Sequence, residues 1–176
     1  MERWKVVKPA ASYRGAMSNA RGRQFEAVID AGCRYYRMHG IANIEKTPEP
    51  FRCLHKGPGG IAKVQFVSHA QPDYKGVLKG GRAIVFEAKA TDKDRIMQNV
   101  LTEKQAGELE LFREMGADSF VCCGIQGRFY MVPYTVWSNF KLFFGRKYAT
   151  ADDLRPWRVC FDGAVKFLDA YDAYRR

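Results

Sequence analysis

The chain of 176 residues carries a formal net charge of +10, and 47% of its residues are hydrophobic and 14% aromatic. This length predicts one domain with a substantial buried core, and no apolar run approaches the ~20 residues that cross a bilayer, so we expect no membrane partner. Five cysteines without a Cys-x-x-Cys pair, and a first segment without the apolar core of a signal peptide, favour a reducing cytoplasm.

Positive charge is concentrated in the first half of the chain. Residues 1–40 carry +5, residues 41–90 carry +4 and residues 91–176 carry only +1. A basic surface attracts polyanions such as nucleic acids, although it also serves general solubility. Residues 1–17 are basic and show no hydrophobic period, so we expect a flexible N-terminal arm, followed by a single domain over 18–176.

The first predicted elements are a helix, a strand and a protruding hairpin. Ser18 or Asn19 can cap a helix over about 21–39, whose apolar stripe comprises Phe25, Val28, Ile29, Cys33 and Tyr36. Residues 41–46 form a short strand candidate that ends at the proline-rich segment 47–50. A glycine-rich loop at 56–60 and a strand-like run at 62–67 predict a hairpin insertion, or stalk, spanning about 47–72.

A strand over 83–90 carries the most informative side chains. Its residues alternate, so that Ile84, Phe86, Ala88 and Ala90 share one face while Val85, Glu87 and Lys89 share the other. Gly80-Gly81 supplies the positive φ angles of a tight hairpin, which folds the segment of Asp73 back beside this strand. The spacing therefore permits a cluster of Asp73, Glu87 and Lys89.

Such a cluster suits metal-dependent phosphodiester hydrolysis. Two carboxylates bind hard cations such as Mg²⁺ or Mn²⁺, and a bound metal activates water and offsets charge on phosphorus. A neighbouring lysine counters the developing negative charge. The alternative is a solvated strand face that carries an ordinary glutamate and lysine.

The second half predicts further helices and strands. Thr102 caps a helix that ends at Met115, and strands over 119–125 and 128–132 form a second hairpin. Pro133 opens a helix through Phe143, a further helix starts near 150, and Asp162 caps a terminal helix that buries Val165, Phe167, Leu168 and Tyr171. Residues 91–101 are expected to form a loop. The order predicts an α/β fold with a mixed central β-sheet flanked by helices, and no glycine-rich phosphate loop supports a nucleotide cofactor.

Several short motifs follow one another in a recognisable order. They are Ser18-Asn19-Ala20-Arg21-Gly22, Lys46-Thr47-Pro48-Glu49-Pro50, Asp73-Tyr74-Lys75-Gly76-Val77 and Phe86-Glu87-Ala88-Lys89. In this order they resemble the motifs of the RecU family of Holliday junction resolvases, within the PD-(D/E)xK nuclease superfamily. The resemblance implies a restriction-endonuclease-like core with a protruding stalk hairpin.

The resemblance also implies residue roles. Asp73 and Glu87 would be ligands of Mg²⁺ or Mn²⁺, Lys89 the catalytic lysine, Gln105 a residue that orients the site, and Glu26 a further acid near the metal. Arg21 would contact DNA near the scissile phosphate. The other candidate DNA contacts are Arg14, Arg23, Arg52, Lys56, Lys63 and Lys75.

The implied activity is the resolution of four-way DNA junctions by paired nicking of opposed strands. The resemblance implies a symmetric homodimer whose stalk enters the open centre of the junction. Two alternatives remain open: a restriction- or repair-type endonuclease on duplex or flap DNA, and a catalytically silent junction-binding protein.

Overall fold

The computed structural model describes residues 9–66, 71–169 and 171, with the backbone alone for residues 9–19, Arg21, Gly60 and Phe66. The helices are α1 (Pro9–Met38), α2 (Glu103–Glu114), α3 (Tyr134–Trp137) and α4 (Phe140–Phe144), with 3₁₀ turns at Pro58–Gly60, Gln98–Val100 and Arg155–Trp157. The strands are β1 (Ala42–Lys46), β2 (Phe51–Lys56), β3 (Ala62–Phe66), β4 (Tyr74–Leu78), β5 (Ala83–Thr91), β6 (Arg95–Met97), β7 (Asp118–Ile125), β8 (Arg128–Pro133) and β9 (Tyr148–Thr150). In the part of the chain that is described, no helix is long and apolar enough to cross a membrane.

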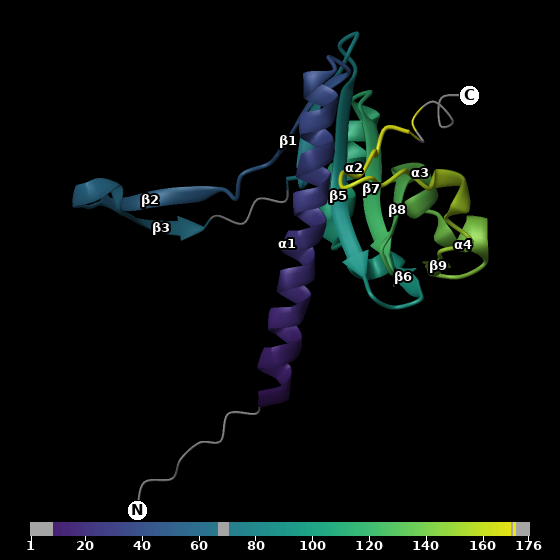
Figure 1. Cartoon of the computed structure of the whole chain (residues 1–176), viewed down its shortest axis with the longest axis horizontal. Coiled ribbons are helices and arrows are strands. Elements are labelled where there is room, and N and C mark those ends of the chain that lie inside the picture. The colour runs from purple at the N-terminus through teal and green to yellow at the C-terminus, as the bar shows by residue number, and fades with distance from the viewer. Residues whose placement is uncertain (1–8, 67–70, 170, 172–176) are drawn as a thin grey trace, which may run out of the picture.

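A mixed five-stranded sheet forms the centre of the molecule, in the order β1-β4-β5-β7-β8 (Figure 1). Strand β5 pairs antiparallel with β4 and parallel with β7, so it lies in the middle of the sheet. The predicted turn at Gly80-Gly81 joins β4 to β5, and both glycines have positive φ angles, of 97° and 91°. The turn sets Tyr74 opposite Phe86 and so brings the start of β4 beside the middle of β5.

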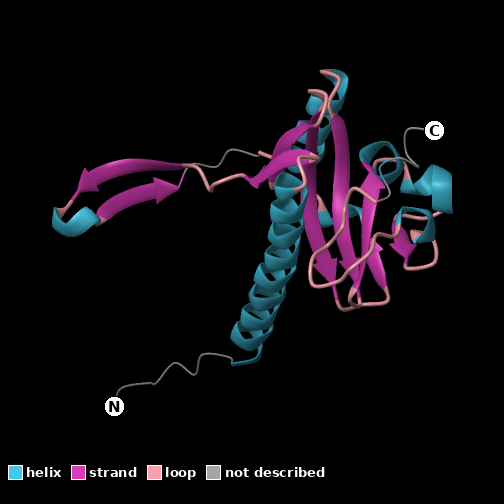
Figure 2. Cartoon of the chain, turned by 45° about the horizontal axis from the view of Figure 1, so that its top comes forward, coloured by secondary structure: helices cyan, strands magenta, loops and turns pink. Residues whose placement is uncertain are grey.

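Each face of the sheet carries its own hydrophobic core. Helix α1 covers one face, where its predicted stripe packs on alternate residues of β5 such as Ile84 and Phe86. Helices α2, α3 and α4 cover the other, where Leu109 and Trp137 pack on Val85 and Val121. Both layers are visible in Figure 2. Because β5 is central, both of its faces are buried, and Glu87 is fully buried with them.

Helix α1 begins earlier than the sequence predicts. Residues 9–17, expected in the N-terminal arm, continue the helix, and residues 1–8 of that arm lie outside the described residues. Proline at the first helical position and the alanines that follow it favour this early start.

Four predictions in the second half of the chain are wrong in their secondary structure. The loop expected over 91–101 contains strand β6. Its antiparallel partner β9 ends at Thr150, near which a helix was expected to start. The helix predicted from Pro133 breaks into α3 and α4 around Ser138 and Asn139. The terminal segment turns back through a bridge between Phe161 and Val165 instead of forming a helix from Asp162. Val165 and Phe167 are nevertheless fully buried, because the apolar pattern marks burial whatever the backbone conformation.

The stalk is a two-stranded hairpin that projects from the body of the molecule (Figure 1). Strands β2 and β3 pair antiparallel, with an irregularity between Cys53 and His55. All six residues of β2 are exposed. The insertion predicted over 47–72 therefore contains this hairpin, although residues 67–70 lie outside the described residues.

Candidate active site

Asp73 is held at the start of β4 by the neighbouring edge strand. The backbone N–H of Thr47 donates to the carbonyl oxygen of Asp73 at 2.8 Å, and the Thr47 hydroxyl donates to the carbonyl of Pro72 at 2.7 Å. Oδ2 of the Asp73 carboxylate accepts from the backbone N–H of Ala88, in β5, at 2.9 Å. These three bonds fix the carboxylate against the middle of the sheet.

Glu87 and Lys89 lie on the same face of β5, as the alternation predicts. Nζ of Lys89 lies 2.9 Å from Oε2 of Glu87 and 3.7 Å from Oδ2 of Asp73. The lysine and Asp73 side chains are 20% and 31% exposed, whereas Glu87 is 0% exposed. Asp73 and Lys89 are therefore the members of the cluster that solvent reaches, and Glu87 lies behind them.

Gln105 joins the same cluster from the first turn of α2. Its Nε2 donates to Oε2 of Glu87 at 2.6 Å. Its Oε1 accepts from the backbone N–H of Thr102, while its own backbone N–H donates to the Thr102 hydroxyl, which completes a capping box. The cap thus fixes the glutamine that orients Glu87.

The electrostatics of Glu87 suit a cation ligand. The pKa of Glu87 is raised from 4.5 to about 7, chiefly because burial disfavours the charged form; Lys89 lowers it, and Asp73 raises it through its charge and a hydrogen bond. Its Oε1 is buried and has no hydrogen-bond partner. A divalent cation between the two carboxylates would relieve their repulsion and give this oxygen a partner, so the donor set fits Mg²⁺ or Mn²⁺. Among the residues that the structure describes, no three acidic, histidine or cysteine side chains gather into a metal site, so the protein would hold the metal through this pair.

Glu26 lies close to the cluster but is engaged elsewhere. Its Oε2 accepts from Nζ of Lys46, at the end of β1, at 2.7 Å. The pKa of Lys46 is in turn raised, chiefly by the hydrogen bond that it donates to Glu26 and more weakly by the charges of Glu26, Asp30 and Asp73, while partial burial opposes the shift. The sequence places Lys46 and Thr47 in a family motif but predicts no role for them at the site, because only the pairing of β1 with β4 brings them beside Asp73.

The candidate DNA contacts lie in two groups. Arg52, Lys56 and Lys63 are exposed on the stalk, and Lys75 is exposed on β4 with its Nζ 3.1 Å from Oε1 of Gln71. Arg23 is exposed on α1. Arg14 and Arg21 belong to the same helix, but their side chains lie outside the described residues.

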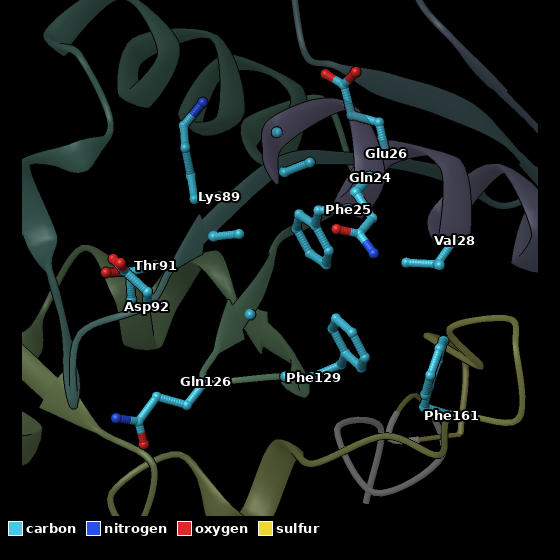
Figure 3. A pocket seen from close by; sticks show the side chains of 15 residues that line it. Gln24, Phe25, Glu26, Val28, Lys89, Thr91, Asp92, Gln126, Phe129 and Phe161 are labelled. Carbon is cyan, nitrogen blue, oxygen red and sulfur yellow. The ribbon is translucent and has the colours of Figure 1, made fainter. Parts of the chain in front are cut away.

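A cavity of about 610 Å³ adjoins the cluster on the side of α1 (Figure 3). Its walls come from α1, the ends of β5 and β7, the turn before β8, and Phe161. Lys89 and Glu26 both contribute to its lining, so the cavity is continuous with the candidate site.

Known proteins share both the sequence pattern and the fold. The family model described as Recombination protein U (RecU) matches residues 20–162. A Holliday junction resolvase RecU from Bacillus pumilus is 30% identical over 159 residues, which cover 84% of this chain and 76% of that protein. The chain belongs to the RecU family. Another RecU, from Streptococcus equi subsp. zooepidemicus, is 37% identical over 82 residues, covering 44% of this chain and 40% of that protein.

The fold of this chain is similar to that of a solved archaeal protein. Hjc, a Holliday junction resolvase from the hyperthermophile Archaeoglobus fulgidus, matches 85% of this chain and 99% of its own, with a TM-score of 0.50. At 12% identity this likeness concerns the fold alone. The central mixed sheet with helices on both faces is therefore the expected restriction-endonuclease-like core.

Proposed function

We propose that this RecU-family protein is a metal-dependent, structure-selective DNA endonuclease that resolves four-way junctions by nicking opposed strands. The observation that carries the proposal is the convergence of Asp73, Glu87, Lys89 and Gln105 beside residues 87–89 of β5. The buried Oε1 of Glu87 has no hydrogen-bond partner, which is costly in a structural ion pair and is explained if this oxygen binds a cation. The names of the relatives, which are junction resolvases, point to the same substrate.

Each residue of the cluster has a defined task in this proposal. Asp73 and Glu87 hold the cation, with Asp73 fixed by the Ala88 N–H and Glu87 by the amide of Gln105. When bound, Mg²⁺ or Mn²⁺ supplies an activated water and offsets charge on the scissile phosphate. The ammonium group of Lys89 stabilises the negative charge that develops on the phosphate oxygens. Glu26 holds Lys46 beside the site and so contributes to the local charge.

We propose that the active form is a homodimer. Paired cuts on opposed strands need two active sites, and the described part of the chain contains one cluster of this kind. The stalk fits a role in the junction centre, because it projects from the body and carries Arg52, Lys56 and Lys63 in exposed positions. The five cysteines, all in described segments, are free, which fits a cytoplasmic protein.

A substrate comparison tests the proposal. Labelled four-way junction, duplex and flap DNAs are incubated with protein and either Mg²⁺, Mn²⁺ or EDTA. We expect metal-dependent paired nicks in the junction, lost in Asp73→Asn and Glu87→Gln. Asp153→Asn is the matched control, since Asp153 is also a partly buried, paired acid but lies outside the cluster.

The two alternative functions give different results in the same assay. A preference for duplex or flap DNA would identify a restriction- or repair-type enzyme. Tight junction binding without cutting in either metal would identify a catalytically silent junction-binding protein.

A further inference from the structure

The cavity beside Lys89 has two unlike sides. Figure 3 shows the rings of Phe25, Phe129 and Phe161 on one side and Lys89, Thr91, Asp92 and Gln126 on the other. Glycines at positions 22, 124 and 127 contribute to the lining without side chains that would fill the space. The volume of about 610 Å³ lies within the range of ~300–1,000 Å³ that is usual for sites of small organic ligands.

The aromatic side is a stacking surface that reaches solvent. The rings of Phe25 and Phe129 stack with centroids 5.5 Å apart and an interplanar angle of 4°. The ring centroids of Phe129 and Phe161 lie 4.9 Å apart. Phe25 is buried in the core, whereas Phe161 is 50% exposed. The series therefore leads from a rigid interior ring to an accessible ring, and nucleic-acid bases stack on surfaces of this kind.

The charges of the lining favour a neutral occupant. Glu26 and Asp92 both contribute to it and would repel a phosphate group. The ammonium of Lys89 is directed to Glu87 and Asp73, while its aliphatic stem lines the cavity. Among the described residues no group of three acidic side chains forms a cation site here. The amides of Gln24 and Gln126 offer donors and acceptors to a planar polar group.

We propose that this cavity receives the unstacked base of a nucleotide next to the scissile phosphate. The inference rests on the proposed nuclease function, because a phosphate held at Lys89 places its own nucleotides at the mouth of the cavity. The base would stack on the exposed ring of Phe161, whose plane is tilted by 54° from that of Phe129, and the two glutamine amides would contact its edge. The cavity thereby determines sequence preference at the cut, while the stalk and the basic residues recognise the branched DNA.

A pocket for an unstacked base would also contribute to the preference of the enzyme for branched DNA. Taking a base out of a duplex costs a few kcal/mol, and the cost is smallest where pairing is already disturbed. At the crossover of a junction the continuous stacking of base pairs is interrupted, so a base there has less stacking to lose than a base in an intact duplex. A nuclease whose cutting requires an unstacked base therefore cuts more readily at the branch point.

Fluorescence of 2-aminopurine tests the proposal, because its emission rises when the base leaves the stack. Cut sites are first mapped with Mg²⁺ or Mn²⁺. Junctions then carry 2-aminopurine on either side of the mapped phosphate, or in the middle of an arm, and emission is measured on binding in EDTA. We expect a rise at one flanking position and none in the arm.

Two phenylalanine variants assign the signal to the cavity. Phe161→Ala should abolish most of the rise and reduce junction cutting about tenfold. Phe143→Ala is the control, because Phe143 is similarly exposed, at 52%, and also packs on a neighbouring phenylalanine, but it lies outside the cavity. It should behave as wild type.

A second pair of variants covers the case in which Phe161→Ala does not fold. Gly22→Leu should fill the cavity from α1, and Gly107→Leu alters an exposed glycine of α2; a Cβ atom meets nothing within 4 Å at either position. We expect loss of the emission rise only in Gly22→Leu.

The outcomes separate this inference from the proposed function. Binding and cutting without a rise at either flanking position would overturn the base pocket and leave the nuclease intact. A rise that survives both Phe161→Ala and Gly22→Leu would place the unstacked base elsewhere. Failure to bind or cut any junction would overturn the proposed function and this inference with it.

Discussion

The side-chain Nε2 of Gln105 donates a hydrogen bond to Oε2 of Glu87 at 2.6 Å, while its side-chain Oε1 accepts from the backbone N–H of Thr102, the residue that caps α2. One residue thus couples the start of a helix to a buried carboxylate in the central strand. The orientation of Glu87 therefore depends on α2 beginning at the observed residue.

Two variants separate the two tasks of Gln105. Thr102→Ala removes the hydroxyl of the cap and should lower the free energy of unfolding by about 0.5–2 kcal/mol with cutting largely retained. Gln105→Ala removes the contact with Glu87 as well and should reduce cutting at least tenfold. Urea unfolding and junction cleavage measure the two effects. Equal losses of activity in both variants would show that Gln105 acts only through the cap.

Thr47 should control metal affinity without contacting the metal. Thr47→Val removes the hydrogen bond to the carbonyl of Pro72, worth about 1 kcal/mol, and loosens the segment that holds Asp73. We expect weaker Mn²⁺ binding in isothermal titration, with Thr47→Ser restoring the wild-type value. If Thr47→Val bound Mn²⁺ as tightly as wild type, this hydrogen bond would not position Asp73.

Glu87 should make metal-free stability dependent on pH. Its pKa is about 7 in the folded protein against 4.5 ordinarily, so the folded state holds an extra proton between these values. The resulting stabilisation is fully present below pH 4.5 and is lost as the pH rises through about 7. In EDTA, Glu87→Gln should therefore lose less stability than wild type over this interval.

The same pair of proteins tests the assignment of the metal. At neutral pH, Mg²⁺ or Mn²⁺ should raise the melting temperature of the wild type and leave Glu87→Gln nearly unchanged, because binding to the folded state alone stabilises it. Equal stabilisation of both proteins would place the metal elsewhere.

The stalk should contribute to junction affinity through its charges. Replacing Arg52, Lys56 and Lys63 together by alanine should weaken binding and reduce the salt dependence of log K by up to about 3, if each residue neutralises one phosphate. The matched control replaces Lys79, Lys104 and Lys141, which are exposed on the body of the molecule. An equal loss of junction affinity in both triple variants would show that the charges of the stalk have no special role in binding.

Local signals in the sequence predict the core of the site. The alternation around Glu87 and Lys89, the Gly80-Gly81 turn and the Thr102 cap are short-range features that depend little on distant partners, and the structure contains all three. The burial of Glu87 could not be predicted in this way. Alternation indicated one buried face of the strand, whereas pairing with β4 and β7 and coverage by helices on both sides bury both faces.

Long-range pairing explains the other differences. Lys46 and Thr47 reach the site only because β1 pairs with β4 across the stalk insertion. Strand β6 forms where a loop was expected because β9, about fifty residues later, provides its partner. The terminal segment keeps its predicted core residues Val165 and Phe167, but irregular backbone positions them instead of a helix.

The most direct test of the central claim is cleavage of a mobile four-way junction labelled on each strand in turn. Wild-type protein with Mg²⁺ or Mn²⁺ should cut opposed strands as a pair, and Asp73→Asn should bind the same junction with similar affinity but leave it uncut. Cutting that persists in Asp73→Asn and Glu87→Gln, or the absence of any metal-dependent nick in the wild type, would contradict the account.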